Sequence, residues 1–214
     1  MKFNDYKIKE FLEDLSSDSP SPGGGSTAAL VASLSGCLNN MVYSLTINKK
    51  SFDKLTEDQK SKMINLEKEC KKFIENSINF MEEDRECFNK LMNSYKLPKE
   101  SEEEINYRKK EIRERTYEAM YAPLKLCREC IDFYSNIEFA LEYGNKMLAS
   151  DAGVSASLLH SAIESSILNV KINLNSLRNE IFFKEIDEEI KITLEKSREK
   201  KEYILNKLDS LIYN

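Results

Sequence analysis

The sequence predicts an all-α protein, and its composition and its apolar periodicity both indicate this. Only 6 of its 214 residues are glycine, 4 are proline and 4 are valine, whereas β-sandwiches and barrels need many turn residues and β-branched residues. Apolar residues instead recur at helical spacing along most of the chain. We expect residues 1–214 to form a single domain, because no linker-like stretch divides them. It would be a helical bundle in which long antiparallel helices surround a buried central helix that follows a Gly-rich loop.

The charge and the cysteine content narrow the class of protein. The formal net charge is −5, so the chain has no basic excess to hold a phosphate backbone, and nucleic acid is not an expected partner. The five cysteines are an odd number, and the first residues are polar, unlike a signal peptide. A reduced, cytoplasmic setting is the simplest interpretation. Cys127 and Cys130 form a lone Cys-x-x-Cys pair; since zinc needs four ligands, we interpret both as ordinary buried cysteines.

A short amphipathic helix is expected first, over residues 5–15. The loop that follows, residues 16–26, holds half of the glycine and half of the proline in the chain. From residue 27 to about residue 47 the side chains are small and apolar around the whole helical circumference. A segment of this length can span a membrane, but Asn39 and Asn40 lie in its middle and the rest of the chain is highly charged. A buried central helix is therefore predicted, with no membrane partner.

A long helix is expected over residues 56–95. Its apolar stripe includes Met63, Phe73 and Leu91, and Asp84 falls at the centre of that stripe when each residue turns 100°. The neighbouring glutamates all reach the outer side of the helix. Asp84 is therefore the one charge that the pattern predicts to be buried.

Further helices are predicted for the rest of the chain. Pro123 is expected to interrupt one of them, because proline lacks the N–H of a helix interior. Ser150 or Asp151 has the character of an N-cap. The remaining helices are expected over residues 100–120, from the break at Pro123 to 143, from about 151 to 183, and from 185 to 212.

The first candidate site is the loop that ends in Gly23, Gly24, Gly25 and Ser26. Successive glycines expose backbone N–H groups with no side chain in the way, and the positive end of the following helix points back at them. This arrangement suits an anionic or planar ligand. The loop lacks the Lys-Ser/Thr ending of a nucleotide-binding P-loop. The alternative is a flexible surface turn capped by Ser26.

Asp84 is the second candidate. A buried carboxylate without a partner is costly, so such a group usually has a purpose. It would act as a general base or as the counter-ion of a cationic substrate. The alternative is a structural carboxylate that forms a salt bridge or caps another helix.

Two weaker candidates lie further along the chain. Asn145 precedes Ser150 and Asp151, where an ordinary N-cap explains the acidic residue equally well. The next helix carries an uncharged face near Ser155, and its amides would hydrogen-bond either a heterocyclic ligand or a neighbouring helix. This face consists of Ala162, Ser166, Asn169 and Asn173.

His160 is the only histidine in the chain. It falls on a charged side of its helix, so we expect it to be exposed. A single histidine cannot supply a histidine-based metal cluster, and a catalytic triad built on it is not expected either. No metal site is predicted.

Taken in order, these motifs resemble those of the cyclodeaminase/cyclohydrolase family. That family comprises the cyclodeaminase domain of formiminotransferase-cyclodeaminase and the stand-alone methenyltetrahydrofolate cyclohydrolases. The likeness covers about residues 8–180, and Cys87 stands where the family usually has alanine. Four motifs carry it: Pro20-Ser21-Pro22-Gly23-Gly24-Gly25-Ser26; Asp84-Arg85-Glu86-Cys87-Phe88 with Leu97-Pro98; Ala122-Pro123-Leu124; and Gly144-Asn145 through Ser150-Asp151-Ala152-Gly153-Val154 to Asn169-Val170-Lys171-Ile172-Asn173-Leu174.

The resemblance implies an all-α subunit, usually a homodimer, that acts on tetrahydrofolate-bound one-carbon units without a metal or redox cofactor. Both substrates of such enzymes are cationic at the reacting carbon, which suits buried carboxylates. On this hypothesis Asp84 and Asp151 are catalytic. The expected substrate contacts are Pro22, Gly23, Gly24, Gly25, Ser26, Asn145, Ser150, Asn169, Asn173 and, for the glutamate tail, Lys50.

Three functions stay open at this point. The first is hydrolysis of 5,10-methenyltetrahydrofolate to 10-formyltetrahydrofolate, which we favour because no formiminotransferase domain is fused to the chain. The second is formiminotetrahydrofolate cyclodeaminase, which releases ammonia from 5-formiminotetrahydrofolate. The third is a non-catalytic folate-binding or assembly subunit with the same fold.

Overall fold

A computed structural model describes residues 2–213, and all regular secondary structure in that part of the chain is helical. The all-α prediction is confirmed. Three short 3₁₀ helices, η1 (Phe3–Asp5), η2 (Lys146–Leu148) and η3 (Asn175–Leu177), accompany the α-helices. The α-helices are α1 (Ile8–Leu15), α2 (Gly24–Ser44), α3 (Lys50–Asp53), α4 (Glu57–Ser94), α5 (Glu102–Tyr143), α6 (Ala149–Leu174) and α7 (Phe183–Ile212).

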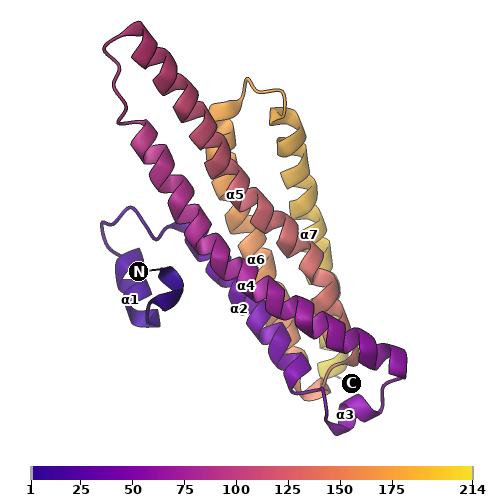
Figure 1. Ribbon diagram of the computed structural model, residues 1–214. Helices are drawn as coiled ribbons and strands as arrows, with labels where there is room; N and C mark the ends of the chain where they lie inside the picture. The colour runs from indigo at the N-terminus through magenta and orange to yellow at the C-terminus, as the bar shows by residue number, and fades with distance from the viewer. Residues whose placement is uncertain (1, 214) are drawn as a thin grey trace.

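The long helices form an antiparallel bundle (Figure 1). α2 packs between α4 and α6, α5 lies against α4 and α6, and α7 covers the side formed by α5 and α6. The hairpin of α4 and α5 projects at one end of the bundle, and α1 stands beside it (Figure 1). α2 thus packs between two long helices, as predicted for a core helix, but it is not buried on all sides, because Leu34 and Leu45 are nearly half exposed.

Local capping explains where the two longest helices begin. Thr56 accepts a hydrogen bond from the N–H of Gln59 at 3.3 Å, and the Gln59 side chain accepts from the N–H of Thr56 at 2.9 Å. Ser101 and Glu104 repeat this reciprocal pair at the start of α5. Such capping boxes satisfy two N–H groups that have no acceptor within the helix. The predicted helices over 56–95 and 185–212 lie close to the observed α4 and α7.

The expected break at Pro123 is wrong, because α5 continues through this residue. A proline at this position leaves the carbonyl four residues earlier, that of Ala119, without its helical N–H donor. The side-chain amide of Asn173 on α6 donates to that carbonyl at 3.1 Å. A neighbouring helix thus satisfies the group that the proline leaves open, and the helix is preserved.

The expected N-cap at Ser150 or Asp151 is also wrong. Both residues lie in the first turn of α6, which begins after Leu148 without a side-chain cap. Asn145 caps the preceding 3₁₀ turn instead, accepting from the N–H of Met147 at 3.1 Å. The helix ends at Leu174, not at 183, and a 3₁₀ turn follows it.

Small residues let α2 approach both of its neighbours closely. A Cβ at Gly36 would lie 2.7 Å from Ile74 on α4. On the other side, Ser35 of α2 and Ser155 of α6 each donate to the other's backbone carbonyl at 2.8 Å. These reciprocal bonds are fully buried, so they fix the register between α2 and α6.

Cys127 and Cys130 are buried and unpaired, as expected. In the part of the chain that the structure describes, no helix combines the length and the hydrophobicity that crossing a bilayer requires.

The expectation that His160 is exposed is wrong, because α7 packs over its side of α6. The side chain is only 6% exposed, and its Nδ1 lies 2.8 Å from the Ser197 hydroxyl on α7, which also pairs with the Tyr134 hydroxyl at 2.9 Å. Burial lowers the pKa of His160 below its usual value of 6.5. The folded protein therefore favours the neutral ring.

This burial predicts a pH dependence of stability. Between about pH 7 and pH 5.5 the unfolded chain binds a proton at His160 more readily than the folded chain, so the free energy of unfolding falls as the pH falls. His160→Gln keeps a polar side chain beside Ser197 and should flatten this dependence. Urea unfolding of both proteins across the pH range measures it; equal slopes would show that His160 does not titrate differently on folding.

Candidate functional site

The first turn of α2 is capped by a residue from another helix. Gly23 occupies the N-cap position and offers no side-chain acceptor to the first N–H groups of the helix. The Asp84 carboxylate of α4 lies there instead and accepts a hydrogen bond from the Ser26 hydroxyl at 2.9 Å. A negative charge is favoured at this positive end of the helix. Asp84 therefore caps another helix, which was one of the alternatives predicted from the sequence.

Asp84 itself is half-buried. Burial raises the pKa of its carboxyl above the usual 3.8, while hydrogen bonds from the side chain and backbone of Ser26 act in the opposite direction. The neighbouring charges pair elsewhere: Arg85 with Glu82, and Lys125 with Glu83. Asp84 is thus a carboxylate held by Ser26, and its pKa is closer to neutrality than that of an exposed aspartate.

Gly25 leaves the space that Asp84 occupies. A Cβ at this position would lie 1.9 Å from the Asp84 Oδ1, far closer than two atoms can pack. Gly24 has room for a Cβ at 3.4 Å from Asn169, and nothing lies within 4 Å of a Cβ at Gly23. The contact with the carboxylate therefore requires a glycine only at position 25, since positions 23 and 24 have room for a Cβ.

A cleft of about 530 Å³ opens over this turn. α4 provides an apolar wall, and the opposite side carries amide and hydroxyl groups from α6 and η3. Asp84 is the only charged group among the described residues that line it. The lining consists of Pro20, Ser21, Gly23, Gly24, Gly25, Asp84, Phe88, Leu91, Met92, Tyr95, Ala119, Asn169, Ile172, Asn173, Asn175 and Ser176.

Two of the three amides that line this cleft, those of Asn169 and Asn173, also have structural roles. Asn173 donates to the carbonyls of Ala119 and Asn169, both at 3.1 Å, which uses both of its N–H groups. Asn169 donates to the Ser165 carbonyl at 2.9 Å. Each amide oxygen, and one N–H of Asn169, remains for a ligand. Helix packing therefore fixes the orientation of both side chains before anything binds.

Pro22 and Ser26 do not line the cleft, although both were expected to contact substrate. Both are buried, and Ser26 lies beneath Asp84. The sequence analysis did not predict the apolar wall as part of a site. The spacing could have indicated it, because Phe88, Leu91 and Tyr95 follow Asp84 on the same side of a helix. Tyr95 is 46% exposed in the structure.

The other predicted site residues lie at the opposite end of α2. The Asn145 N–H donates to the Thr46 hydroxyl at 2.8 Å, and Asn145 and Lys50 line a separate hollow beside Leu45. Ser150 and Asp151 lie in the first turn of α6. Asp151 and Asn169 are 18 residues apart, about 27 Å along the helix. A single chain therefore does not bring Asp84 and Asp151 together.

Comparison with known proteins identifies the family. The family model described as formiminotransferase-cyclodeaminase matches residues 7–192. The chain belongs to the formiminotransferase-cyclodeaminase family. It is 34% identical to a methenyltetrahydrofolate cyclohydrolase of Methylorubrum extorquens over 179 residues, which are 83% of this chain and 84% of that protein.

Two further relatives differ in how much of their own length this chain covers. The formimidoyltransferase-cyclodeaminase of Rattus norvegicus is 27% identical over 96% of the chain, but the chain spans only 37% of that protein. The crystal structure of formiminotetrahydrofolate cyclodeaminase from Thermotoga maritima superposes with a TM-score of 0.77 at 26% identity. The match covers 97% of this chain and 96% of that one, so the whole fold is shared.

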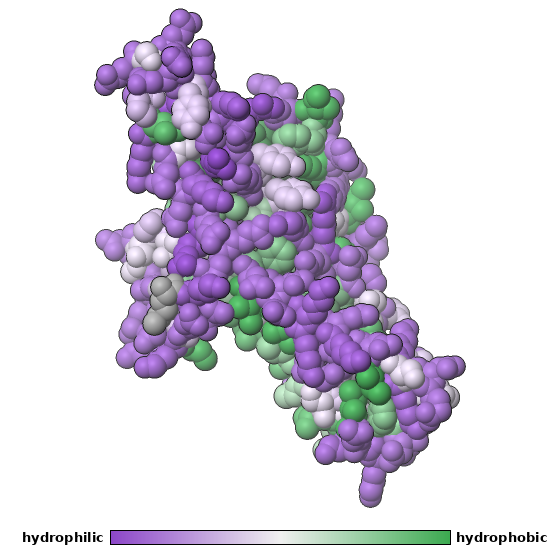
Figure 2. Space-filling view, in the orientation of Figure 1, coloured by the Kyte–Doolittle hydropathy of each residue, from purple (hydrophilic) through white to green (hydrophobic). Residues whose placement is uncertain are grey.

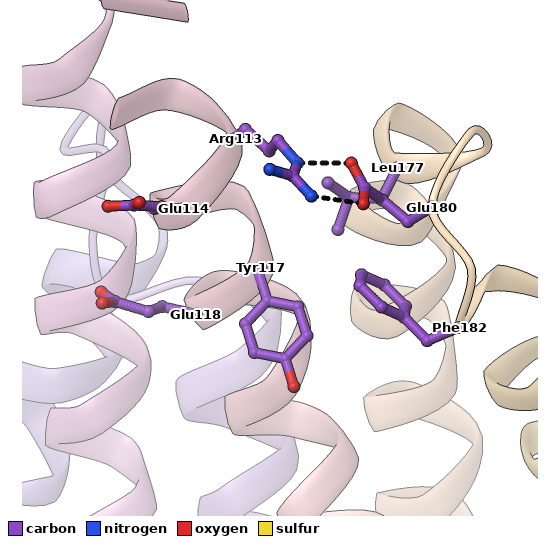
Figure 3. A pocket seen from close by; sticks show the side chains of 7 residues that line it. All are labelled: Arg113, Glu114, Tyr117, Glu118, Leu177, Glu180 and Phe182. Carbon is purple, nitrogen blue, oxygen red and sulfur yellow. Dashed lines mark hydrogen bonds and ion pairs between the residues drawn. The ribbon is translucent and has the colours of Figure 1, made fainter. Parts of the chain in front are cut away.

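A second cleft, of about 490 Å³, lies between α5 and the turn after α6 (Figure 3). The Tyr117 and Phe182 rings meet edge to face there with centroids 5.2 Å apart. Arg113 is held by Glu180 through two hydrogen bonds of 2.5 and 2.6 Å. None of the residues in the four family motifs lines this cleft. The Asp84 cleft therefore remains the candidate site of this chain.

The packing of Asp84 against Gly25 predicts a difference between two alanine variants. Gly25→Ala forces the carboxylate away from Ser26, and such overpacking costs about 1–3 kcal/mol. Gly23→Ala has open space and should stay within about 0.5 kcal/mol of the wild type. Urea unfolding measures both; equal stabilities would contradict the close contact.

Proposed function

We propose that this chain is a folate one-carbon enzyme that hydrolyses 5,10-methenyltetrahydrofolate to 10-formyltetrahydrofolate. The observation that carries the proposal is Asp84: a single carboxylate, held at the first turn of α2, in a cleft that has no other charged side chain among its lining residues. The methenyl compound is a cation, so its charge and that of the cleft are complementary. The cyclohydrolase of Methylorubrum extorquens, which the chain resembles over most of its length, supports this assignment.

The cleft fits a planar, polar ring. Phe88 and Met92 of α4 offer it an apolar wall, while Asn169 and Asn173 of α6 offer amide oxygens across the cleft. Amide oxygens accept hydrogen bonds from ring N–H and amino groups, and such groups are abundant on a pterin. Ring binding is therefore assigned to the α4 and α6 walls, and the reacting carbon to the Asp84 end.

The chemistry needs a water molecule and one proton acceptor. Water adds to the carbon between N5 and N10, the amidinium charge is neutralised, and Asp84 takes the proton that the water loses. The N5–carbon bond of the tetrahedral intermediate then breaks, the proton of its hydroxyl group passes to N5, and the carbon remains on N10 as a formyl group. One water is consumed and one proton is released overall. Gly24 and Gly25 line the cleft at the start of α2, and backbone N–H groups at a helix start suit a developing negative oxygen.

Cyclodeamination is the second candidate, supported by the structural match to the cyclodeaminase of Thermotoga maritima. In that reaction N10 attacks the formimino carbon carried on N5, and ammonia leaves with a proton. The same carboxylate serves both reactions, since both pass through a cationic one-carbon unit. Release of ammonia from 5-formiminotetrahydrofolate distinguishes them.

We further propose a homodimer that works in the cytoplasm and needs neither a metal nor a redox cofactor. The unpaired state of all five cysteines supports a reducing compartment. The acid–base chemistry above requires only groups that this chain supplies. Nucleic acid is not proposed as a partner, in keeping with the net charge of −5.

The first test measures turnover of 5,10-methenyltetrahydrofolate. The loss of its near-ultraviolet absorbance is recorded with the protein and compared with a buffer blank. Asp84→Asn should lower kcat by at least about 100-fold, since it removes the general base. Asp209→Asn makes the same change at an exposed position of α7 and should leave the rate unchanged. Wild-type protein that does not accelerate the decay would sink the cyclohydrolase proposal; a non-catalytic subunit would show no difference among the three proteins.

The Ser26 hydrogen bond predicts a shift in the pH profile. Asp84 acts as a base only when it is deprotonated, so turnover is lost as the pH falls through its raised pKa. Ser26→Ala removes an interaction that lowers this pKa, so the acid limb of kcat/KM should move to higher pH. An unmoved limb would mean that another group sets it.

A further inference from the structure

Pro123 lies near the middle of α5, which runs unbroken from Glu102 to Tyr143. Proline is the least favourable residue in a helix interior, because it has no N–H to bond the carbonyl four residues earlier and its ring crowds that carbonyl. The other three prolines, at positions 20, 22 and 98, all lie in loops. Pro123 does not end its helix, so its local effect is a backbone carbonyl without a helical donor.

That carbonyl, of Ala119, lies at the edge of the Asp84 cleft. Ala119 is among the residues that line the cleft, and so is Asn173 on the neighbouring helix α6. The Asn173 side-chain nitrogen donates to the Ala119 carbonyl at 3.1 Å and to the Asn169 carbonyl of its own helix at 3.1 Å. An amide NH₂ group has two hydrogens, so these two bonds use both of them. The hydrophilic and hydrophobic residues of one face of the molecule are shown in Figure 2.

Two carbonyl acceptors leave the Asn173 amide only one orientation. The two ends of an asparagine amide have nearly the same shape but opposite hydrogen-bonding character. If the group turned over, its oxygen would face two carbonyl oxygens with no hydrogen between them, which is unfavourable. The nitrogen therefore faces the two helices, and the amide oxygen remains free to accept a hydrogen bond from a ligand in the cleft.

Asn169, the neighbouring amide of the cleft, is fixed in a different way. It donates to the Ser165 carbonyl of its own helix at 2.9 Å, so α6 alone determines how this side chain lies. Asn173 belongs to the last turn of α6, which ends at Leu174, and it is bonded across to α5. Its orientation therefore depends on a carbonyl of α5 that is open because residue 123 is a proline.

A residue with an N–H at position 123 would change this arrangement. Its N–H would bond the Ala119 carbonyl along the axis of α5, as in an ordinary helix, and the crowding by the proline ring would end. The Asn169 carbonyl would then be the main acceptor left to Asn173, and that carbonyl lies within α6, where it accepts a helical bond as well. The Asn173 side chain would turn more freely, and its oxygen would face the cleft only part of the time.

We propose that Pro123 is a positioning residue for the substrate, which acts through Asn173. Pro123 itself is buried and does not line the cleft. Because it lacks an N–H, the Ala119 carbonyl binds Asn173, and this bond presents the Asn173 oxygen, rather than its NH₂ group, to the ligand. The cleft then selects a ring by an edge that donates hydrogen bonds, such as the ring N–H and amino group of a pterin. The role in recognition rests on the proposed function, whereas the coupling of Pro123 to Asn173 does not.

A double-mutant cycle on stability tests the coupling without any ligand. In the wild-type background, Asn173→Ala removes the donor of a carbonyl that has no helical one; in the Pro123→Ala background, the N–H at position 123 supplies a donor. Asn173→Ala should therefore lower the urea midpoint more in the wild type than in Pro123→Ala. Changes in helix propensity and volume at position 173 are common to both backgrounds and cancel. Equal shifts would refute the coupling, and the proposal with it.

Steady-state kinetics test the effect on the substrate. Pro123→Ala should raise KM for 5,10-methenyltetrahydrofolate by about 2- to 10-fold, the range for one hydrogen bond, and leave kcat unchanged, because the contact of Asp84 with α2 is intact. Asn173→Ala should raise KM at least as much. Adding Pro123→Ala to it should raise KM no further, since no amide is left to orient. The control is Pro98→Ala, the same change at an exposed position between α4 and α5, which should alter neither constant.

Three kinetic results would contradict the positioning role. They are an unchanged KM in Pro123→Ala, a loss in kcat rather than in KM, and effects of Pro123→Ala and Asn173→Ala on KM that multiply. Wild-type protein that binds tetrahydrofolate in a calorimeter but does not turn over the methenyl compound would refute the proposed reaction alone; the dissociation constant of tetrahydrofolate then replaces KM in the same cycle. Wild-type protein that neither turns over nor binds would overturn both proposals.

Discussion

The contact between Asp84 and the first turn of α2 is the constraint on which the rest of the structure depends. α2 begins at a glycine that offers no cap, so its positive end needs an acceptor from elsewhere. Asp84 reaches it only because Gly25 has no side chain. The same contact closes the helix end and positions a carboxylate in the cleft, where burial raises the pKa of that carboxyl. The packing of this helix end and the chemistry proposed for Asp84 therefore depend on the same hydrogen-bonded group.

Packing around α2 prepares the remaining parts of the site. The reciprocal bonds of Ser35 and Ser155 set the register of α6, and that register places Asn169 beside Gly24. Pro123 leaves a carbonyl that Asn173 satisfies, so a proline in α5 orients an amide of the cleft. Groups that are fixed by the fold before binding lose little freedom when a ligand arrives, which favours both affinity and catalysis.

The apolar character of α2 on all sides has two consequences rather than one. A helix that is apolar all round is predicted to be buried, and the core side of α2 is. Within one chain, however, its outer stripe remains open, with Leu34 and Leu45 nearly half exposed. The same pattern therefore gives α2 one side that packs in the core and one apolar side that stays exposed.

The sequence by itself determined what depends on local interactions. Composition and apolar periodicity predicted an all-α chain, helices close to the observed 57–94 and 183–212, and the packing of α2 in the core. The spacing around Asp84 predicted a carboxylate on the core side. Tertiary structure alone decided what depends on contacts between distant segments. Asn173 allows α5 to continue through Pro123, α7 buries His160, and the length of α6 separates Asp151 from Asp84. These outcomes depend on which helices meet and in which register, and no local pattern contains that information.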